Sequence, residues 1–339
     1  MVSAAHTFYV VGLGSMGKRR IRNLMMLGVP AQRIVGFDPR TARCSEVART
    51  YGIRTSSDFK KGVKAFKPSA LIISTPPDKH APYMLFAARN ALHFFVEVTT
   101  VDDGYRTLMP LLTKRFVAAP SCTFRYVPAI QTMRTLLQKG SIGTPLFFQH
   151  YLGQYLPDWH PYEDFRKVYF SKKKTGGARE MFPYELQWLG FLLGSRVKRA
   201  SGVVTKVSRL PIHADDVYSS TVQYESGVVG SVNIDLLNRK ASRTLRIVGS
   251  KGTIEWDWLA RTVTVSTPGK RSNTIKFPRE KKFKHYNTTE NIYIAEMKDF
   301  LDAVRGKKRY PYSFAEDWAI LQTMYDVEKR SKQLLKRHR

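Results

Sequence analysis

Residues 8–18, FYVVGLGSMGK, constrain the fold more than any other segment of the chain. The segment reads as a short apolar strand that enters a G-x-G-x-x-G loop and then a helix. Gly12 permits a tight turn, Gly14 lets the backbone approach a pyrophosphate, and Gly17 allows close packing of helix on strand. A pyrophosphate would be bound by the N–H groups at the start of that helix.

A second apolar strand, residues 33–37, ends in Asp38, about 20 residues after the last glycine. A carboxylate at this point binds the ribose hydroxyls of NAD and repels the 2′-phosphate of NADP. Arg40 and Arg43 weaken this preference for NAD without reversing it. The alternative is a glycine-rich turn that binds nothing, and strand, spacing and acid together disfavour it. The predicted cofactor-binding residues here are Gly12, Leu13, Gly14, Ser15, Met16, Gly17 and Asp38.

A chain of 339 residues with 43% hydrophobic residues is expected to form two globular domains. It has no apolar run of about 18 residues that would span a membrane, and its start does not resemble a signal peptide. Its two cysteines, Cys44 and Cys122, lack the spacing of metal ligands. We therefore predict a reduced, cytoplasmic protein without a metal site.

The chain is strongly basic, with 56 Lys and Arg against 27 Asp and Glu and a formal net charge of +29. Such a surface attracts phosphates of any kind, including those of nucleic acids. The sequence contains no recognisable nucleic-acid-binding motif. We therefore interpret the charge as solvated surface and predict that nucleic acid is not the partner.

The first 120 residues alternate between short apolar strands and helices. Predicted strands at 70–74, 93–98 and 116–119 follow the two already described, and helices are predicted at 41–51 and from 78 or 80 to 91. Apolar strands that alternate with helices indicate a parallel sheet covered on both faces. We predict a Rossmann domain over residues 1–122.

The pattern changes after about residue 125. Helices are predicted at 127–139, 290–304 and 314–335, with the end of another at 188–193. Strands are predicted at 146–152, 245–248, 253–256 and 262–265, with a hairpin over 217–237. We predict an α+β domain over 123–339, with a mostly antiparallel sheet that could join subunits of a homo-oligomer and a last helix that could return to the first domain.

The order of these motifs resembles the Gfo/Idh/MocA family of oxidoreductases. The resemblance rests on the glycine loop, on 74–80 (STPPDKH), 93–97 (HFFVE), 122–128 (CTFRYVP), 140–143 (GSIG), 176–177 (GG) and 249–253 (GSKGT). It implies a nicotinamide cofactor, bound by a Rossmann domain, and a sugar pocket in the second domain. It adds Ser74, Thr75, Pro76, His80 and Glu97 to the cofactor site. Residues 153–161 (GQYLPDWHP) resemble a branch associated with surface-polysaccharide sugars.

Two family motifs are altered. The family's E-K-P motif is replaced by Glu97-Val98-Thr99, so the lysine that contacts the reacting hydroxyl is a valine. In the second motif, an ungapped match places Tyr184 at the catalytic histidine and Gln187 at the aspartate that follows. Glu180 or Met181 falls at the first aspartate of that motif.

Oxidation of an alcohol needs a group that takes the hydroxyl proton. Tyr184 could do so only if nearby cations such as Arg179 lowered its pKa from about 10. Glu180 is the second candidate, either as the base or as a residue that orients Tyr184. The structural alternative for Tyr184 is a half-buried aromatic side chain with a satisfied hydroxyl.

Three further residues are candidates for substrate binding. Arg125 could hold a carboxylate or phosphate in bidentate fashion, or serve as a structural ion-pair partner. Trp159 and His160 lie in a loop where aromatic faces and polar groups suit a sugar ring, although such loops also serve as structural corners. His80 is expected to cap its helix or line the cofactor groove.

These observations favour an NAD(P)-dependent oxidoreductase that acts on a sugar or nucleotide-linked sugar, with Tyr184 or Glu180 handling the proton. Because Val98 replaces the family lysine, a cofactor-binding pseudoenzyme is the alternative. A basic nucleic-acid-associated protein is a weaker one.

Overall fold

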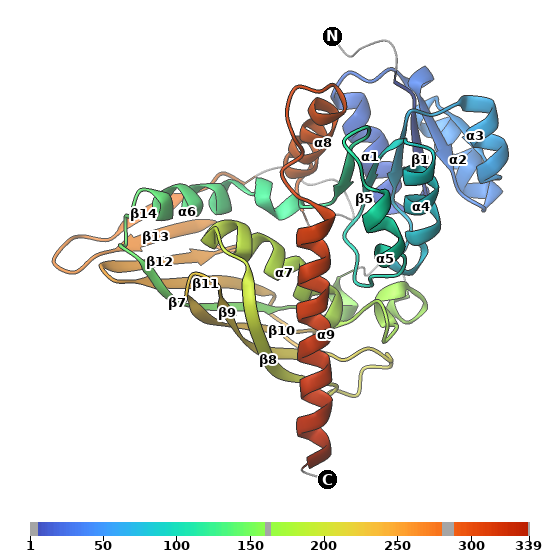
Figure 1. The fold of residues 1–339 in the computed structure, drawn as a ribbon. Coiled ribbons are helices and arrows are strands. Elements are labelled where there is room, and N and C mark those ends of the chain that lie inside the picture. Colours follow the sequence, from blue (N-terminus) through green and yellow to red (C-terminus); the bar gives the residue numbers. More distant parts are fainter. Residues whose placement is uncertain (1–5, 160–163, 280–287, 338–339) are drawn as a thin grey trace. The chain divides into compact units, whose positions relative to one another are not determined.

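The computed structural model describes residues 6–159, 164–279 and 288–337 of the chain. The chain forms two compact units (Figure 1). Unit 1 comprises Met1–Thr123 and Glu290–Trp318, and unit 2 comprises Phe124–Thr289 and Ala319–Arg339. The domain limits of 122 and 123 read from the sequence stay a prediction.

Unit 1 is built on a six-stranded parallel sheet with the order β3-β2-β1-β4-β5-β6. This is the order of the doubly wound dinucleotide-binding fold, and ligands bind where the strand order reverses, here between β1 and β4. The strands are β1 (Phe8–Val11), β2 (Ile34–Phe37), β3 (Arg54–Ser56), β4 (Ala70–Ile73), β5 (His93–Val96) and β6 (Ala118–Pro120). The predicted parallel sheet is confirmed.

Helices cover both faces of this sheet, and every residue of β1, β2 and β4 is buried as a result. The helix α8 returns to unit 1 from a late part of the sequence and packs against α1. The helices are α1 (Ser15–Met26), α2 (Thr41–Tyr51), α3 (Phe59–Phe66), α4 (Ala81–Arg89), α5 (Tyr105–Leu108) and α8 (Glu290–Val304). Short 3-10 helices are η1 (Ala31–Arg33), η2 (Pro77–Lys79) and η3 (Met109–Leu111), and η4 (Thr123–Tyr126) spans the boundary of the two units.

Unit 2 contains an eight-stranded sheet with the order β14-β13-β12-β11-β7-β10-β9-β8. Neighbouring strands are antiparallel except for the pair β7 and β10. The predicted mostly antiparallel sheet is therefore confirmed. The strands are β7 (Pro145–Gly153), β8 (Val197–Thr205), β9 (Val217–Tyr224), β10 (Val229–Asp235), β11 (Ser242–Gly249), β12 (Gly252–Asp257), β13 (Thr262–Ser266) and β14 (Asn273–Lys276).

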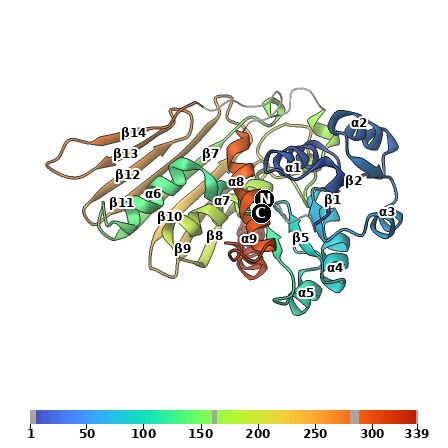
Figure 2. The ribbon, with the colours of Figure 1, turned by 90° about the horizontal axis from the view of Figure 1, so that it is seen from above.

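One face of this sheet is covered by α6 (Pro128–Gln138) and α7 (Ala178–Leu193), as Figure 1 and Figure 2 show. Along β9 and β10 buried residues alternate with more exposed ones, because only one face is covered by helices. The last helix, α9 (Phe314–Arg337), is fastened to β8, since the Ser331 hydroxyl accepts a hydrogen bond of 2.8 Å from the Val204 N–H. Between β7 and α7 lie η5 (Leu156–Asp158), η6 (Phe165–Lys167) and η7 (Tyr169–Ser171).

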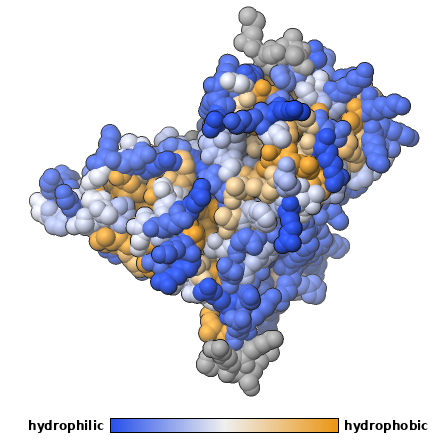
Figure 3. All heavy atoms as spheres, in the orientation of Figure 1, coloured by the Kyte–Doolittle hydropathy of each residue, from blue (hydrophilic) through white to orange (hydrophobic). Residues whose placement is uncertain are grey.

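Hydrophilic residues dominate the face of the molecule shown in Figure 3, with smaller apolar areas between them. The exposed apolar side chains of unit 2 include Leu146 and Phe147 on β7. Assembly of subunits through this sheet stays a prediction.

Candidate functional site

The three glycines of the loop after β1 each occupy a position where the local geometry favours glycine. Gly12 has a φ of +92°, and a Cβ there would lie 2.8 Å from the Ser74 carbonyl oxygen. A Cβ on Gly17 would lie 1.9 Å from the carbonyl oxygen of Gly12. For Gly14, the nearest described atom to such a Cβ is an Arg43 nitrogen at 3.6 Å. The first and third glycines are thus required by the fold, whereas the second leaves room for a ligand.

The carboxylate of Asp38 lies at the end of β2 and is 2% exposed. It accepts hydrogen bonds from the backbone N–H groups of Leu13 (3.1 Å) and Arg40 (3.0 Å), and Arg43 lies 3.4 Å away. Burial opposes its ionisation, but these N–H groups and the two arginines outweigh burial and lower the pKa of Asp38. Asp38 is therefore ionised at neutral pH, in contact with the glycine loop.

The segment after β4 carries Ser74, Thr75, Pro76 and His80. His80 is the N-cap residue of α4, but its imidazole makes no capping hydrogen bond and instead donates from Nε2 to the Thr75 carbonyl at 2.7 Å. Burial lowers the pKa of His80 to about 4, so the ring is neutral. Among the described residues, the buried Nδ1 of His80 and Oγ1 of Thr75 have no hydrogen-bond partner. Both atoms are thus available to a bound ligand.

Glu97 follows β5 and is held by a buried arginine that the sequence interpretation missed. The Arg20 guanidinium donates to Glu97 at 2.6 and 3.0 Å, and Ser74 Oγ lies 3.5 Å from the same carboxylate. Arg20 on α1 is fully buried. Arg20 stands among other basic residues in the segment 18–22, and only its position on the buried side of α1 reveals its role.

Together these features define unit 1 as a dinucleotide-binding domain. Its glycines leave space for a pyrophosphate at the start of α1, and Asp38 offers an ionised carboxylate to ribose hydroxyls. The buried polar atoms of Thr75 and His80 add acceptor and donor groups without partners among the residues described. The residues present therefore fit NAD, which would be held by the glycine loop, Asp38 and the segment 74–80.

In unit 2, the candidate Glu180 lies in the first turn of α7 and contacts Tyr169 of η7. The Tyr169 hydroxyl donates to Glu180 Oε1 at 2.6 Å. The second oxygen, Oε2, is shielded from solvent and has no hydrogen-bond partner within the described parts of the chain. Burial raises the pKa of Glu180 to about 7, although the Tyr169 hydrogen bond lowers it. The carboxyl can thus exchange a proton near neutral pH.

Tyr184 lies one turn after Glu180, at the i+4 position that places both side chains on one face of α7. Its ring is half-buried and packs edge-to-face on Phe124, with centroids 4.8 Å apart. Arg179, the cation expected to act on Tyr184, donates instead to Glu328 at 2.6 Å and to the Lys174 carbonyl at 2.6 Å. Much of its charge is therefore compensated by Glu328.

A buried polar cluster fixes α7 on the sheet. Glu185 accepts hydrogen bonds from His150 of β7 (2.7 Å), Trp188 (2.9 Å) and Arg243 of β11 (2.7 Å). Burial opposes the ionisation of Glu185, but Arg243 and His150 outweigh burial and lower its pKa. Since Glu180 and Tyr184 precede this anchor on the same helix, their positions are set by it.

The remaining predicted residues are less closely grouped. Arg125 is buried, and its guanidinium lies 5.2 Å from the ring centre of Phe191. Trp159 packs edge-to-face on Phe170 at 6.0 Å. His160 lies outside the described residues. Val98 is half-buried directly after Glu97.

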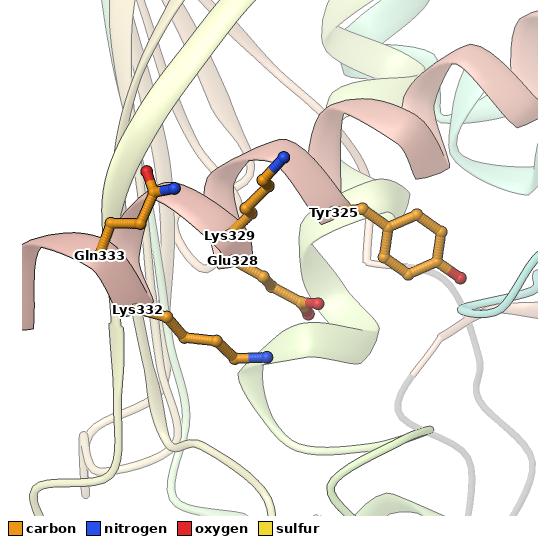
Figure 4. A pocket seen from close by; sticks show the side chains of 5 residues that line it. All are labelled: Tyr325, Glu328, Lys329, Lys332 and Gln333. Carbon is orange, nitrogen blue, oxygen red and sulfur yellow. The ribbon is translucent and has the colours of Figure 1, made fainter. Parts of the chain in front are cut away.

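A hollow of about 450 Å³ lies along α9 and contains none of the predicted site residues (Figure 4). It is lined by Tyr325, Glu328, Lys329, Lys332 and Gln333.

Within the part of the chain that the structure describes, no group of three or more His, Cys, Asp or Glu side chains is arranged to hold a metal ion. In the same residues, no helix has both the length and the apolar character needed to cross a bilayer.

Comparison with protein families agrees with the assignment of unit 1 as a dinucleotide-binding domain. Residues 7–106 match the oxidoreductase family with an NAD-binding Rossmann fold, and residues 130–255 match the GFO/IDH/MocA C-terminal domain. The chain belongs to the GFO/IDH/MocA family of oxidoreductases. The predicted family, the Rossmann domain and NAD as its cofactor are thereby confirmed.

Relatives of known activity are distant but cover most of the chain. The scyllo-inositol 2-dehydrogenase (NAD+) of Bacillus subtilis is 24% identical over 88% of this chain and 86% of its own length. Levoglucosan dehydrogenase in complex with NADH and levoglucosan has the same fold, with a TM-score of 0.82, 18% identity and 97% coverage of both chains. The WlbA dehydrogenase of Bordetella pertussis, solved with NADH and UDP-GlcNAcA, has a TM-score of 0.78, 16% identity and 97% coverage of both chains.

Proposed function

We propose that this protein is an NAD-dependent dehydrogenase that interconverts a hydroxyl and a carbonyl on a sugar ring, with Glu180 as the proton acceptor. The observation that carries the proposal is the shielded Glu180 Oε2 without a partner among the described residues, on the same face of α7 as Tyr184. The relatives that act on inositol and levoglucosan support a ring polyol or sugar as the substrate.

NAD supplies the hydride acceptor for such a reaction when it is bound. The chain's own part is to take the proton: as the C–H bond of the substrate breaks, the hydroxyl proton passes to Glu180 Oε2 and the C=O bond forms. A carboxyl with a pKa near 7 is suited to this transfer in both directions at neutral pH. Tyr184, one turn away, would donate a hydrogen bond to the substrate oxygen or orient it.

The proposal extends to the kind of sugar and to the nicotinamide end of the site. The resemblance of 153–161 to a polysaccharide-associated branch and the WlbA structure with UDP-GlcNAcA support a nucleotide-linked sugar. Arg125 is the residue that would meet the anionic part of such a substrate. We further propose that Glu97 shapes the nicotinamide end of the site, where Arg20 fixes its carboxylate.

Turnover tests the proposal. NADH formation is measured with wild-type protein against scyllo-inositol, levoglucosan and a set of UDP-sugars, and then with Glu180→Gln and Tyr184→Phe. Removal of a general base costs roughly 10²–10⁴-fold in rate, so Glu180→Gln should lose at least that much on the best substrate. A loss below about tenfold would exclude Glu180 from this role.

A chain that binds NADH but turns over no member of the panel would instead support the pseudoenzyme. Comparison of the free and UDP-linked sugars separates the two substrate classes. Tyr184→Phe keeps the ring that packs on Phe124, so its rate loss reports on the hydroxyl alone.

A further inference from the structure

The two oxygens of the Glu180 carboxylate have different surroundings. Oε1 accepts a 2.6 Å hydrogen bond from the Tyr169 hydroxyl, while Oε2 is hidden from solvent but lacks a partner in the residues described. Buried polar atoms are nearly always hydrogen-bonded, so an orphaned one at a candidate site needs an explanation. Tyr169 occupies one oxygen and leaves the other to a reacting group.

Tyr169 is held in place by the paired glycines that precede α7. A Cβ on Gly176 would lie 2.0 Å from the Cα of Phe170, so only glycine lets η7 lie against the start of α7. The Gly177 N–H donates to the Phe170 carbonyl at 2.8 Å, and the Thr175 hydroxyl donates to the Tyr169 carbonyl at 2.7 Å. The glycine pair thus brings the Tyr169 ring to Glu180.

The Tyr169 hydrogen bond also acts on the proton affinity of the carboxyl. A donor to the ionised form favours that form, whereas burial disfavours it. Burial and the Tyr169 hydrogen bond are the two influences on the pKa of Glu180. The neighbouring Arg179 pairs with Glu328 instead. Without the hydroxyl, the buried carboxyl would hold its proton to higher pH and would be a poor base at neutral pH.

We propose that Tyr169 is a positioning residue: its hydroxyl holds Glu180 Oε1 so that Oε2 meets the reacting hydroxyl. This inference rests on the proposed function of Glu180. It assigns a role to a tyrosine outside the altered family motifs, in the loop that leads to them.

Infrared difference spectroscopy of the full-length protein tests the inference without substrate. The Glu180 carboxyl band is assigned by subtraction of the Glu180→Gln spectrum, and its titration is followed in wild type and Tyr169→Phe. Loss of a hydrogen bond to a charged group should raise the midpoint by about one to two pH units. Tyr151→Phe is the matched control, because Tyr151 donates to a different carboxylate, Asp235, at 2.7 Å.

Turnover then separates the inference from the function on which it rests. In Tyr169→Phe the acidic limb of the pH–rate profile should move upward with the infrared midpoint, while Tyr151→Phe leaves both unchanged. An unchanged Glu180 midpoint in Tyr169→Phe, with the fold intact by circular dichroism, overturns the inference. A shifted midpoint with an unshifted rate profile shows that Glu180 is not the base, and then the proposed function fails while the pairing stands.

Discussion

Arg20 holds two carboxylates that come from distant parts of the sequence, Glu97 at 2.6 and 3.0 Å and Glu296 at 2.8 Å. The side chains of Arg20 and Glu296 are both 0% exposed. Glu296 also accepts hydrogen bonds from Ser121 at 2.9 Å and Thr123 at 2.7 Å. One arginine on α1 therefore connects the segments that follow β5 and β6.

Replacing Arg20 should strongly destabilise unit 1. Arg20→Met would leave two carboxylates without their shared cation, and breaking a buried ion pair from one side typically costs about 3–5 kcal/mol. We expect the free energy of unfolding to fall by this amount in urea titrations followed by circular dichroism. Binding of NADH should weaken as well, because Glu97 loses its anchor.

The pair Arg246 and Glu255 provides the control for this prediction. Its nitrogen and oxygen are 3.4 Å apart, but both side chains are about half exposed. Exposed pairs contribute about 0–1 kcal/mol, so Arg246→Met should change stability little. A loss of at most about 1 kcal/mol from Arg20→Met, as expected for the exposed pair, would show that the buried network does not stabilise unit 1.

Asp38 should determine the choice between NAD and NADP. Asp38→Asn removes the charge that repels a 2′-phosphate and weakens the hydrogen bonds to the ribose hydroxyls. We expect about a tenfold loss of NADH affinity by calorimetry, with NADPH affinity unchanged or improved. Because its lowered pKa keeps Asp38 ionised, this difference should be constant between pH 6 and 8. A wild-type preference for NADPH would refute the assignment and direct attention to Arg40 and Arg43.

Glu180 should make the stability of unit 2 depend on pH. Its folded-state pKa of about 7 lies above the ordinary value of 4.5, so its contribution to stability is fully present below pH 4.5 and is lost as pH rises through 7. The Glu180→Gln variant has no carboxyl to ionise at this position, so it does not lose this stability as the pH rises. Its stability relative to wild type should therefore be greater at pH 8 than at pH 5, as measured by thermal unfolding.

Glu255→Gln serves as the comparison, since Glu255 is exposed on β12. Its stability relative to wild type should show little of this pH dependence. If the Glu180 variant behaves in the same way as the Glu255 variant, the carboxyl of Glu180 titrates normally and is a poor candidate for the base.

The substitution Val98→Lys offers a further test of the site. A lysine at this position would supply the hydrogen-bond donor and charge that valine lacks, next to Glu97 at the end of β5. Val98→Lys should create or raise sugar dehydrogenase activity, whereas Val98→Met, of similar length but uncharged, should not. Activity that is absent in wild type and in Val98→Lys, despite NADH binding, would favour the pseudoenzyme.

Much of the fold could be predicted from local patterns. The helix predicted at 41–51 has these limits in α2, and the strand predicted at 70–74 is β4. Two of the strands that were missed begin without an apolar signal and lie at sheet edges: β3 is Arg-Thr-Ser, and β8 begins Val-Lys-Arg. Edge strands need few apolar residues, so periodicity does not reveal them.

Site residues could be predicted where they lie at a fixed spacing in the sequence. They could not be predicted where their role depends on contacts formed only in the folded chain. The glycine loop and Asp38 have a fixed spacing because one βαβ unit positions both. Tyr169 and Arg20 donate hydrogen bonds to carboxylates 11 and 77 positions away, respectively. No sequence spacing encodes these pairs, and a basic run such as 18–22 gives no sign that Arg19 and Arg20 are buried.

The partners of α1 set an order of events for the newly made chain. Arg19 and Asn23 bind Glu290, and Arg20 binds Glu296, so α1 meets these carboxylates only after at least 267 further residues have been synthesised. Until then, the apolar residues of the dinucleotide-binding sheet lack α8, which contributes Met297, Phe300 and Leu301 to their core. A fragment that ends at Thr123 would carry the whole glycine loop and still lack the helix that completes its core. The N-terminal part of this protein therefore matures after the middle of the chain has left the ribosome.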